Sequence, residues 1–250
     1  MHLQKPLCDL SIIIVTWNSL GEIGACLRSI FESKVNLEVI IVDNNSTDGT
    51  VDFVKKEWPQ CKLIEAGGNL GFARANNIGI RVAQGRYILL LNPDTVILGD
   101  AIGIVLDEMD HHPRIGIAGC TLVDAKGNVQ RSNFPFPTPA YDLHLLLPGF
   151  GDHESIPQDS GLTEVRGFLI GAFLMVRREA LEEVGGLDEQ IFMYGEDVEW
   201  CYRMTRHGWG IGYCPRARVV HIGNVSGQKA FGAKRLEMVY RGITYFQRKY

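Results

Sequence analysis

The sequence predicts an α/β domain in which helices cover both faces of a mainly parallel central sheet. Over the first 120 residues, short apolar runs alternate with segments whose apolar residues recur at helical spacing. This alternation is typical of parallel sheets that are buried on both faces. The chain has 250 residues, of which 46% are hydrophobic and 22% are charged, so it is long enough to bury a sizeable core.

Strands are expected where short runs are continuously apolar or rich in Val and Ile. The first run covers residues 10–16, and the second covers 37–42. The run at 87–91 is apolar throughout and follows Gly85, which favours a fully buried strand. Further strands are expected at 62–65, 168–176, 209–214 and 217–222.

Helices are expected where apolar residues follow a 3.6-residue period. Polar capping residues at 43–49 precede one of these segments, and Gly185 and Gly186 follow another. The expected helices cover 23–31, 51–58, 69–83, 102–109, 178–184 and the segment between Glu196 and Gly208.

Residues 131–161 form a proline-rich stretch without periodicity, too long for a simple connection. A flap or binding segment is expected there. Its hydrophobic cluster either packs on its own domain or contacts an apolar acceptor or a lipid surface. This cluster consists of Leu143, Leu145, Leu146, Leu147 and Phe150.

The C-terminal segment, residues 226–250, is predicted to be a basic amphipathic helix. Its apolar stripe is Leu236, Val239, Ile243 and Phe246. The stripe either docks on the domain or lies on an anionic bilayer. The basic residues, set against the single acidic Glu237, are Lys229, Lys234, Arg235, Arg241, Arg248 and Lys249.

Composition excludes several classes of function. The net charge of −4 and pI of about 6.0 give no sign of nucleic-acid binding. The six cysteines contain no C-x-x-C pair, which indicates buried thiols in a reducing compartment. No run of 18 apolar residues and no apolar leader is present. A cytoplasmic protein is therefore expected, and contact with the inner face of the plasma membrane is left open.

Four polar side chains stand at predicted strand ends or at a helix start. Asp43, Asp94 and His221 follow strands, and Asp197 begins a helix. Each could be only a turn, cap or strand-end residue. Together they suit a nucleotide-sugar site, because ligands of open α/β sheets bind at the carboxyl ends of the strands. Asp94 is also a hard oxygen ligand of the kind that Mg²⁺ and Mn²⁺ prefer.

A series of motifs occurs in order along the chain. The motifs are Val15-Thr16-Trp17-Asn18, the segments 42–49 and 69–77, Asn92-Pro93-Asp94, Gly171-Ala172, the segments 185–189 and 192–203, and finally His221 and Ser226. From about residue 10 to residue 250, this order resembles the family 2 glycosyltransferases. Within that family it is most similar to the bacterial rhamnosyltransferase-like subgroup.

The resemblance implies a single GT-A domain, a Rossmann-like fold, over residues 7–225. The nucleotide-sugar half would cover about 7–125 and the acceptor half about 126–225. It implies inverting transfer from a nucleotide-diphosphate sugar, by analogy dTDP-rhamnose, to a glycan or lipid-linked hydroxyl, with Mg²⁺ or Mn²⁺ as cofactor.

The resemblance also implies roles for individual residues. Asp197 would be the general base, with Glu196 beside it, and Asp94 and His221 would hold the metal. Asn92 replaces the first carboxylate of the family's Asp-x-Asp motif, so one metal ligand is lost. The implied donor-binding residues are Thr16, Asn18, Asp43, Asn45, Asn69, Arg74, Asn92 and Asp94.

Two other functions fit parts of the sequence. A sugar nucleotidyltransferase shares substrates and fold class, but no glycine-rich basic loop near the first strand could hold a triphosphate. A non-catalytic binding module on a degenerate transferase scaffold is consistent with Asn92. The absence of a G-x-G-x-x-G motif after a strand argues against a dinucleotide-dependent dehydrogenase.

Overall fold

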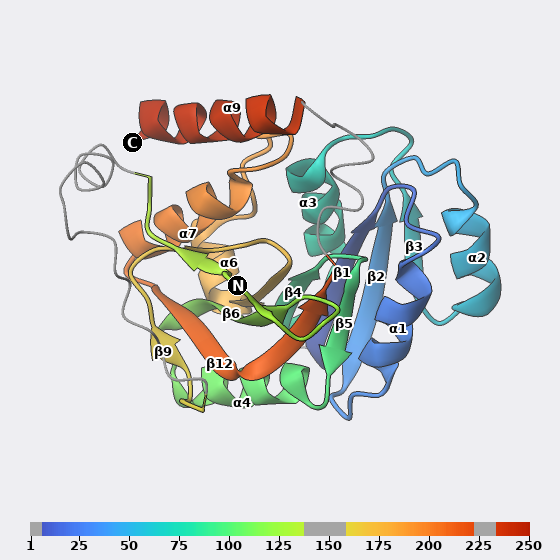
Figure 1. Cartoon of the computed structure of the whole chain (residues 1–250), viewed down its shortest axis with the longest axis horizontal. Coiled ribbons are helices and arrows are strands. Elements are labelled where there is room, and N and C mark those ends of the chain that lie inside the picture. The colour runs from blue at the N-terminus through green and yellow to red at the C-terminus, as the bar shows by residue number, and fades with distance from the viewer. Residues whose placement is uncertain (1–6, 138–158, 223–233) are drawn as a thin grey trace.

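The computed structural model describes residues 7–137, 159–222 and 234–250. Within these ranges a ten-stranded sheet forms the centre of the molecule (Figure 1). Its main path runs through β3 (Lys62–Glu65), β2 (Leu37–Asp43), β1 (Cys8–Thr16), β4 (Gly85–Leu91), β11 (Phe173–Arg177), β6 (Ile115–Val123), β12 (Gly210–His221) and β5 (Thr95–Leu98). The short strands β7 (Val129–Gln130) and β9 (Thr163–Glu164) pair with β6 and β12, and β8 (Asn133–Phe134) pairs separately with β10 (Phe168–Leu169).

The N-terminal half of the sheet is parallel, and the C-terminal half is mixed. Strands β3, β2, β1 and β4 run in the same direction. Strand β11 is antiparallel to both β4 and β6, whereas β12 is parallel to β6 and antiparallel to β5. The predicted α/β fold with a mainly parallel sheet is therefore confirmed.

Helices cover both faces of the sheet because neighbouring strand residues point to opposite sides. Ile12 and Ile14 of β1 join the core beneath α1 (Ile23–Phe31), α2 (Thr50–Glu57) and α4 (Ala101–His111). Ile13 joins the opposite core, beneath α3 (Phe72–Val82), α6 (Arg178–Val184) and α7 (Glu196–Arg206). The last helix, α9 (Lys234–Lys249), lies outside α7 (Figure 1).

Five strands were not predicted: β5, β6 and the two-residue strands β7, β8 and β9. All nine residues of β6 are buried, but Gly116 and Gly119 interrupt its apolar run. Gly116 is required by packing, since a Cβ atom there would lie 2.8 Å from Cβ of Trp209. The strand signal is therefore weakened by residues that allow close packing.

Two predicted strand boundaries were wrong. The expected strand at 168–176 is divided, because the chain turns at Gly171 and Ala172 between β10 and β11. The expected strands at 209–214 and 217–222 form the single strand β12. Its register shifts between Cys214 and Arg218, and Pro215 lies in that irregularity.

Within the predicted C-terminal segment 226–250, residues 234–249 form α9, and the C-terminal half of α9 docks on the domain. Phe246 is 2% exposed and packs against Tyr202 of α7. Leu236 and Tyr240 remain exposed. The hydrophobic cluster at 143–150 and Ser226 lie outside the described residues. Within the described ranges, no helix has both the length and the apolar character needed to cross a bilayer.

Candidate functional site

Three segments distant in sequence meet at one edge of the sheet. Leu91, the last residue of β4, pairs with Phe173, the first residue of β11. This pairing places Asn92 beside Ala172, whose carbonyl accepts a hydrogen bond from the Asn92 N–H at 3.1 Å. His221 ends β12 and pairs with Thr95 of β5. The topology therefore brings the Asn-Pro-Asp motif, the Gly-Ala turn and the C-terminal histidine together.

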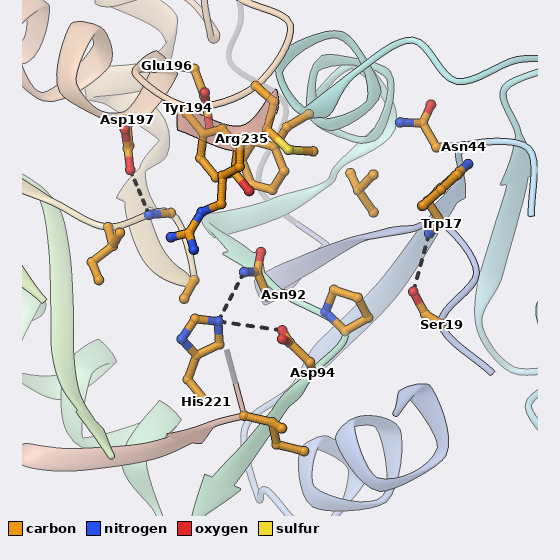
Figure 2. Close-up of a pocket in the computed structure, with 18 of the residues that line it drawn as sticks. Trp17, Ser19, Asn44, Asn92, Asp94, Tyr194, Glu196, Asp197, His221 and Arg235 are labelled. Carbon is orange, nitrogen blue, oxygen red and sulfur yellow. Dashed lines mark hydrogen bonds and ion pairs between the residues drawn. The ribbon is translucent and has the colours of Figure 1, made fainter. Parts of the chain in front are cut away.

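Asp94 and His221 face one another at this edge (Figure 2). His221 Nε2 lies 3.6 Å from Asp94 Oδ1 and 3.5 Å from Asn92 Nδ2. The main chain supports the pair, since Ile222 N–H donates to the Asp94 carbonyl at 3.0 Å. Burial lowers the pKa of His221, and the Asp94 carboxylate partly opposes that effect. A neutral imidazole beside a carboxylate is a suitable pair of metal ligands.

The residues present fit a divalent cation that shares its coordination with a bound ligand. No cluster of three or more His, Cys, Asp and Glu side chains suited to a metal occurs in the described part of the chain. Mg²⁺ commonly takes only one or two carboxylates and completes its coordination with water and substrate phosphates. Asp94 and His221 therefore suit a cation held against a phosphate group.

A cavity of about 420 Å³ opens beside this pair. Of the predicted site residues, six line it: Asn69, Asn92, Asp94, Glu196, Asp197 and His221. The cavity lining also includes five residues that are not among the predicted site residues: Trp17, Ser19, Asn44, Tyr194 and Arg235 (Figure 2).

Thr16 and Asp43, which the resemblance assigns to donor binding, are buried and hydrogen-bonded to each other. Thr16 Oγ1 donates to Asp43 Oδ1 at 2.9 Å. Asp43 also accepts hydrogen bonds from Ser46 N–H and Ser46 Oγ, and it is only 2% exposed. In this conformation, the two residues fix the loop after β2 and are absent from the cavity lining.

Asn18 and Asn45 likewise shape this loop, and both have positive φ angles, 51° and 70°. Asn18 Oδ1 accepts a hydrogen bond from Thr47 N–H at 2.8 Å. Asn44, between the predicted positions, lines the cavity instead. Its amide oxygen accepts from Leu70 N–H at 2.9 Å, which joins two loops of the cavity wall.

Arg74 lies away from the cavity lining, although it was expected to contact the nucleotide. Its side chain is 56% exposed, and Nε donates to the Glu189 carbonyl at 3.3 Å. In the described conformation, Arg74 links α3 to the segment that precedes α7. The donor-binding roles assigned to Thr16, Asn18, Asp43, Asn45 and Arg74 stay predictions.

Glu196 and Asp197 begin α7, after Gly195 with φ 104°. Asp197 Oδ2 accepts a hydrogen bond from Gly171 N–H at 3.1 Å, and Oδ1 accepts one from Val198 N–H at 2.9 Å. These bonds hold the carboxylate at the cavity wall (Figure 2). Among the described residues, the buried Glu196 Oε2 has no hydrogen-bond partner.

Burial governs the acidity of both carboxyl groups. Main-chain hydrogen bonds at the start of α7 favour the ionised form of Asp197 and so act to lower its pKa. Burial is the larger effect and raises the pKa of Asp197. Burial, together with the Asp197 charge, raises the pKa of Glu196 to about 8. The cavity therefore holds two carboxyl groups with increased proton affinity.

The sequence matches the family model described as "Glycosyl transferase family 2" over residues 11–185. The chain belongs to glycosyl transferase family 2. This membership sets aside the dehydrogenase and nucleotidyltransferase alternatives, and it supports a transferase over a non-catalytic module.

Characterised relatives place this family 2 glycosyltransferase near rhamnosyltransferases. It is 30% identical to the N-acetylglucosaminyl-diphospho-decaprenol L-rhamnosyltransferase of Mycobacterium tuberculosis, over 85% of this chain and 75% of that protein. It is also 30% identical to the dTDP-rhamnosyl transferase RfbF of Shigella flexneri, over 86% of this chain and 69% of that protein. The predicted rhamnosyltransferase-like membership is confirmed.

Solved structures confirm the GT-A fold. The mannosyltransferase PcManGT from Pyrobaculum calidifontis, solved with GDP-Man and Mn²⁺, has a TM-score of 0.68 and 20% identity over 98% of this chain. TarS from S. aureus has a TM-score of 0.66 and 17% identity over 95% of this chain. The chain spans 65% of the first structure and 39% of the second, which is less than two-thirds of either.

The basic residues of α9 in this glycosyltransferase have specific contacts. Arg241 pairs with Glu237 at 2.6 Å, and Lys249 Nζ lies 2.8 Å from Oε1 of the buried Glu199. Arg235 lines the cavity. Lys229 and the side chain of Lys234 lie outside the described residues. The contact of this helix with a membrane stays a prediction. Of the basic residues expected to face a bilayer, Arg241 and Lys249 pair with carboxylates and Arg235 lines the cavity.

Replacing Glu196 with Gln is expected to change the pH dependence of stability. The ordinary pKa of a glutamate is 4.5, and that of Glu196 in the folded chain is about 8. At pH values between these two, Glu196 has lost its proton in the unfolded chain but keeps it in the folded chain. This contribution to folding is therefore fully present below about pH 4.5 and is lost as the pH rises through about 8. When the pH is raised from 5.5 to 8.5, the Tm of wild type should therefore decrease by several degrees more than the Tm of Glu196→Gln. Parallel pH profiles for the two proteins would contradict this pKa.

Proposed function

We propose that this family 2 enzyme is an inverting glycosyltransferase that moves rhamnose from dTDP-rhamnose to a hydroxyl of a lipid-linked glycan. One observation supports the proposal most: the Asp94–His221 pair and the Asp197 carboxylate line the same cavity. The Asp94–His221 pair suits binding of the donor diphosphate, and Asp197 suits removal of a proton from the acceptor.

Asp94 and His221 would hold Mg²⁺ or Mn²⁺ against the donor diphosphate, with Asn92 beside them. A cation there would act as a Lewis acid that stabilises the negative charge of the leaving group. PcManGT was solved with both GDP-Man and Mn²⁺ bound, which supports this use of a divalent metal by analogy. The neutral form of His221, favoured by burial, is the form that can bind a cation.

Asp197 would accept the proton of the acceptor hydroxyl. As that oxygen attacks the anomeric carbon, the bond from this carbon to the diphosphate oxygen breaks, and the nucleoside diphosphate leaves. Attack from the face opposite the leaving group inverts the anomeric centre. The raised pKa of Asp197 makes it a stronger base than an ordinary aspartate. The hydrogen bonds from Gly171 and Val198 fix its position.

The proposed donor and acceptor follow from the relatives. RfbF is named a dTDP-rhamnosyl transferase, and the M. tuberculosis protein is named for N-acetylglucosaminyl-diphospho-decaprenol. The solved structures contain UDP or GDP-Man, so donors with other bases are the competing candidates. Cytoplasmic location, with contact at the inner membrane face, belongs to the same proposal.

A donor screen by thermal shift tests the proposed function. In the presence of MnCl₂, dTDP-rhamnose at 100 times its Kd should stabilise the fold by about 2.7 kcal/mol. For a chain of this size, that corresponds to an increase in Tm of about 5 to 10 °C. UDP-N-acetylglucosamine and GDP-mannose serve as matched alternatives. A larger shift with one of them would replace the proposed donor, and no shift with any nucleotide sugar would contradict the proposed function.

A further inference from the structure

Arg235 in the first turn of α9 reaches the same cavity as the Asp94–His221 pair. It lines the cavity together with Asn92, Asp94 and His221, although it lies 14 positions after His221 in the sequence. Its side chain extends past Tyr194 into the space between these groups (Figure 2). The C-terminal helix therefore contributes a cation to a site otherwise built by strand ends and the start of α7.

The guanidinium is not committed to a carboxylate of the described chain. Ion pairs occupy Arg241 and Lys249 of the same helix, but none formed among the described residues includes Arg235. Its aromatic contact is with the Tyr194 ring, whose centroid lies 5.7 Å from Cζ. A guanidinium is always charged and offers several N–H donors in one plane, a geometry that matches phosphate oxygens.

The middle and the end of α9, the helix that carries Arg235, pack against the segment that carries the carboxylates. A Cβ atom on Gly242 would lie 1.9 Å from the Tyr194 carbonyl oxygen, so the helix backbone touches the turn directly before Glu196. Tyr194 itself has a positive φ of 66°. At the other end of α9, Lys249 Nζ lies 2.8 Å from Glu199 Oε1 in α7. Contacts at its middle and at its end thus hold α9 on α7.

We propose that Arg235 binds a diphosphate group in the cavity. The group belongs either to the nucleotide-sugar donor or to a lipid diphosphate acceptor, because both carry the same chemistry. In the first case, Arg235 adds a second positive charge to the leaving group. In the second, it orients the acceptor hydroxyl toward Asp197. The inference rests on the proposed function, and it makes α9 part of the active site.

Isothermal titration in MnCl₂ tests this inference with three probes. The probes are dTDP, thymidine, which lacks the diphosphate, and farnesyl diphosphate. Arg235→Ala should weaken the binding of one diphosphate probe by about 10- to 100-fold, as expected for loss of charge-assisted hydrogen bonds. Thymidine binding should not change. Arg235→Lys should lose less affinity, because it keeps the charge but not the planar donor pair.

Arg241→Ala is the matched control, since Arg241 is on the same helix and its side chain is 78% exposed. It should bind all probes as wild type does. Loss of dTDP binding alone assigns Arg235 to the donor, and loss of farnesyl diphosphate binding alone assigns it to the acceptor. Unchanged affinity for both diphosphates in Arg235→Ala would overturn the inference while leaving the proposed function intact. If Arg235→Ala fails to fold, unchanged binding by Arg235→Lys and by Arg235→Gln overturns it instead. Absence of diphosphate binding by wild type would contradict the proposed function itself.

Discussion

Asp197→Asn is expected to lower the rate of sugar transfer by about 10²- to 10⁴-fold, because an amide cannot accept the proton of the acceptor hydroxyl. The affinity for the donor should stay within a few-fold of wild type, since Asp197 is proposed to act on the acceptor. Steady-state kinetics should therefore show a decrease in kcat with little change in the KM for the donor.

A loss of folding must be separated from a loss of the base. Asp197 accepts hydrogen bonds from two main-chain N–H groups, and Asn can accept with only one oxygen. A destabilisation of about 1–3 kcal/mol is therefore expected, and the assay must be run well below the Tm of the variant. Glu65→Gln is a suitable control, because this exposed carboxylate pairs with Lys55 away from the cavity. If Asp197→Asn transfers sugar at nearly the wild-type rate, Asp197 is not the base, and Glu196 becomes the next candidate.

Asp94→Ala should remove the metal-dependent part of donor binding. Substitutions that only reorient a metal ligand typically cost about 10- to 100-fold in affinity, so removing a ligand should cost at least about 100-fold. The measurement is titration of dTDP with and without MnCl₂. Wild type should bind more tightly with the metal, whereas Asp94→Ala should bind equally weakly under both conditions.

Asp124→Ala provides the matched control for a carboxylate at a strand end. Asp124 directly follows β6, as Asp94 closely follows β4, but it is absent from the cavity lining. Its oxygens accept hydrogen bonds from Lys126 and Asn128 within a turn. This variant should lose some stability and keep metal-dependent binding. Asp94 would be only a turn residue if its replacement left the Mn²⁺ effect unchanged.

The sequence pattern predicted the elements that have a continuous apolar run or a regular apolar stripe. Strands β1, β2 and β4 have such runs, and the predicted helices have such stripes. Strand β6 escaped prediction because Gly116 and Gly119 permit close contacts from other elements. The division between β10 and β11 likewise depends on the turn at Gly171, whose N–H donates to Asp197. These features are set by tertiary packing and leave little periodic signal.

The site was predictable where its residues lie at strand ends. Asn92, Asp94 and His221 meet because parallel and antiparallel neighbours place their ends at one edge of the sheet. Arg235 could not be placed in the same way, because its position depends on the return of α9 over α7. The basic, amphipathic character of 226–250 was the available signal. This character indicated a docked or membrane-bound helix, but it could not predict which basic side chain would point into the cavity.

Tyr194 and Asn44 show a second limit of sequence reasoning. Both lie within recognised motifs, yet their neighbours were the residues assigned to the site. Asn44 lines the cavity while Asp43 is turned into hydrogen bonds with Thr16 and Ser46. Which side of a loop faces a cavity depends on local φ angles, such as 70° at Asn45, that the sequence pattern does not specify.

A transfer assay with defined substrates tests the proposed sugar transfer most directly. Wild-type protein, dTDP-rhamnose, MnCl₂ and an N-acetylglucosaminyl-diphospho-lipid acceptor would be incubated, and the product analysed by mass spectrometry and NMR. We expect an acceptor that carries one added rhamnose with an anomeric configuration opposite to that of the donor, and no product when the metal is chelated. A rhamnosylated product with retained configuration, or equal product formation without metal, would contradict the proposed transfer.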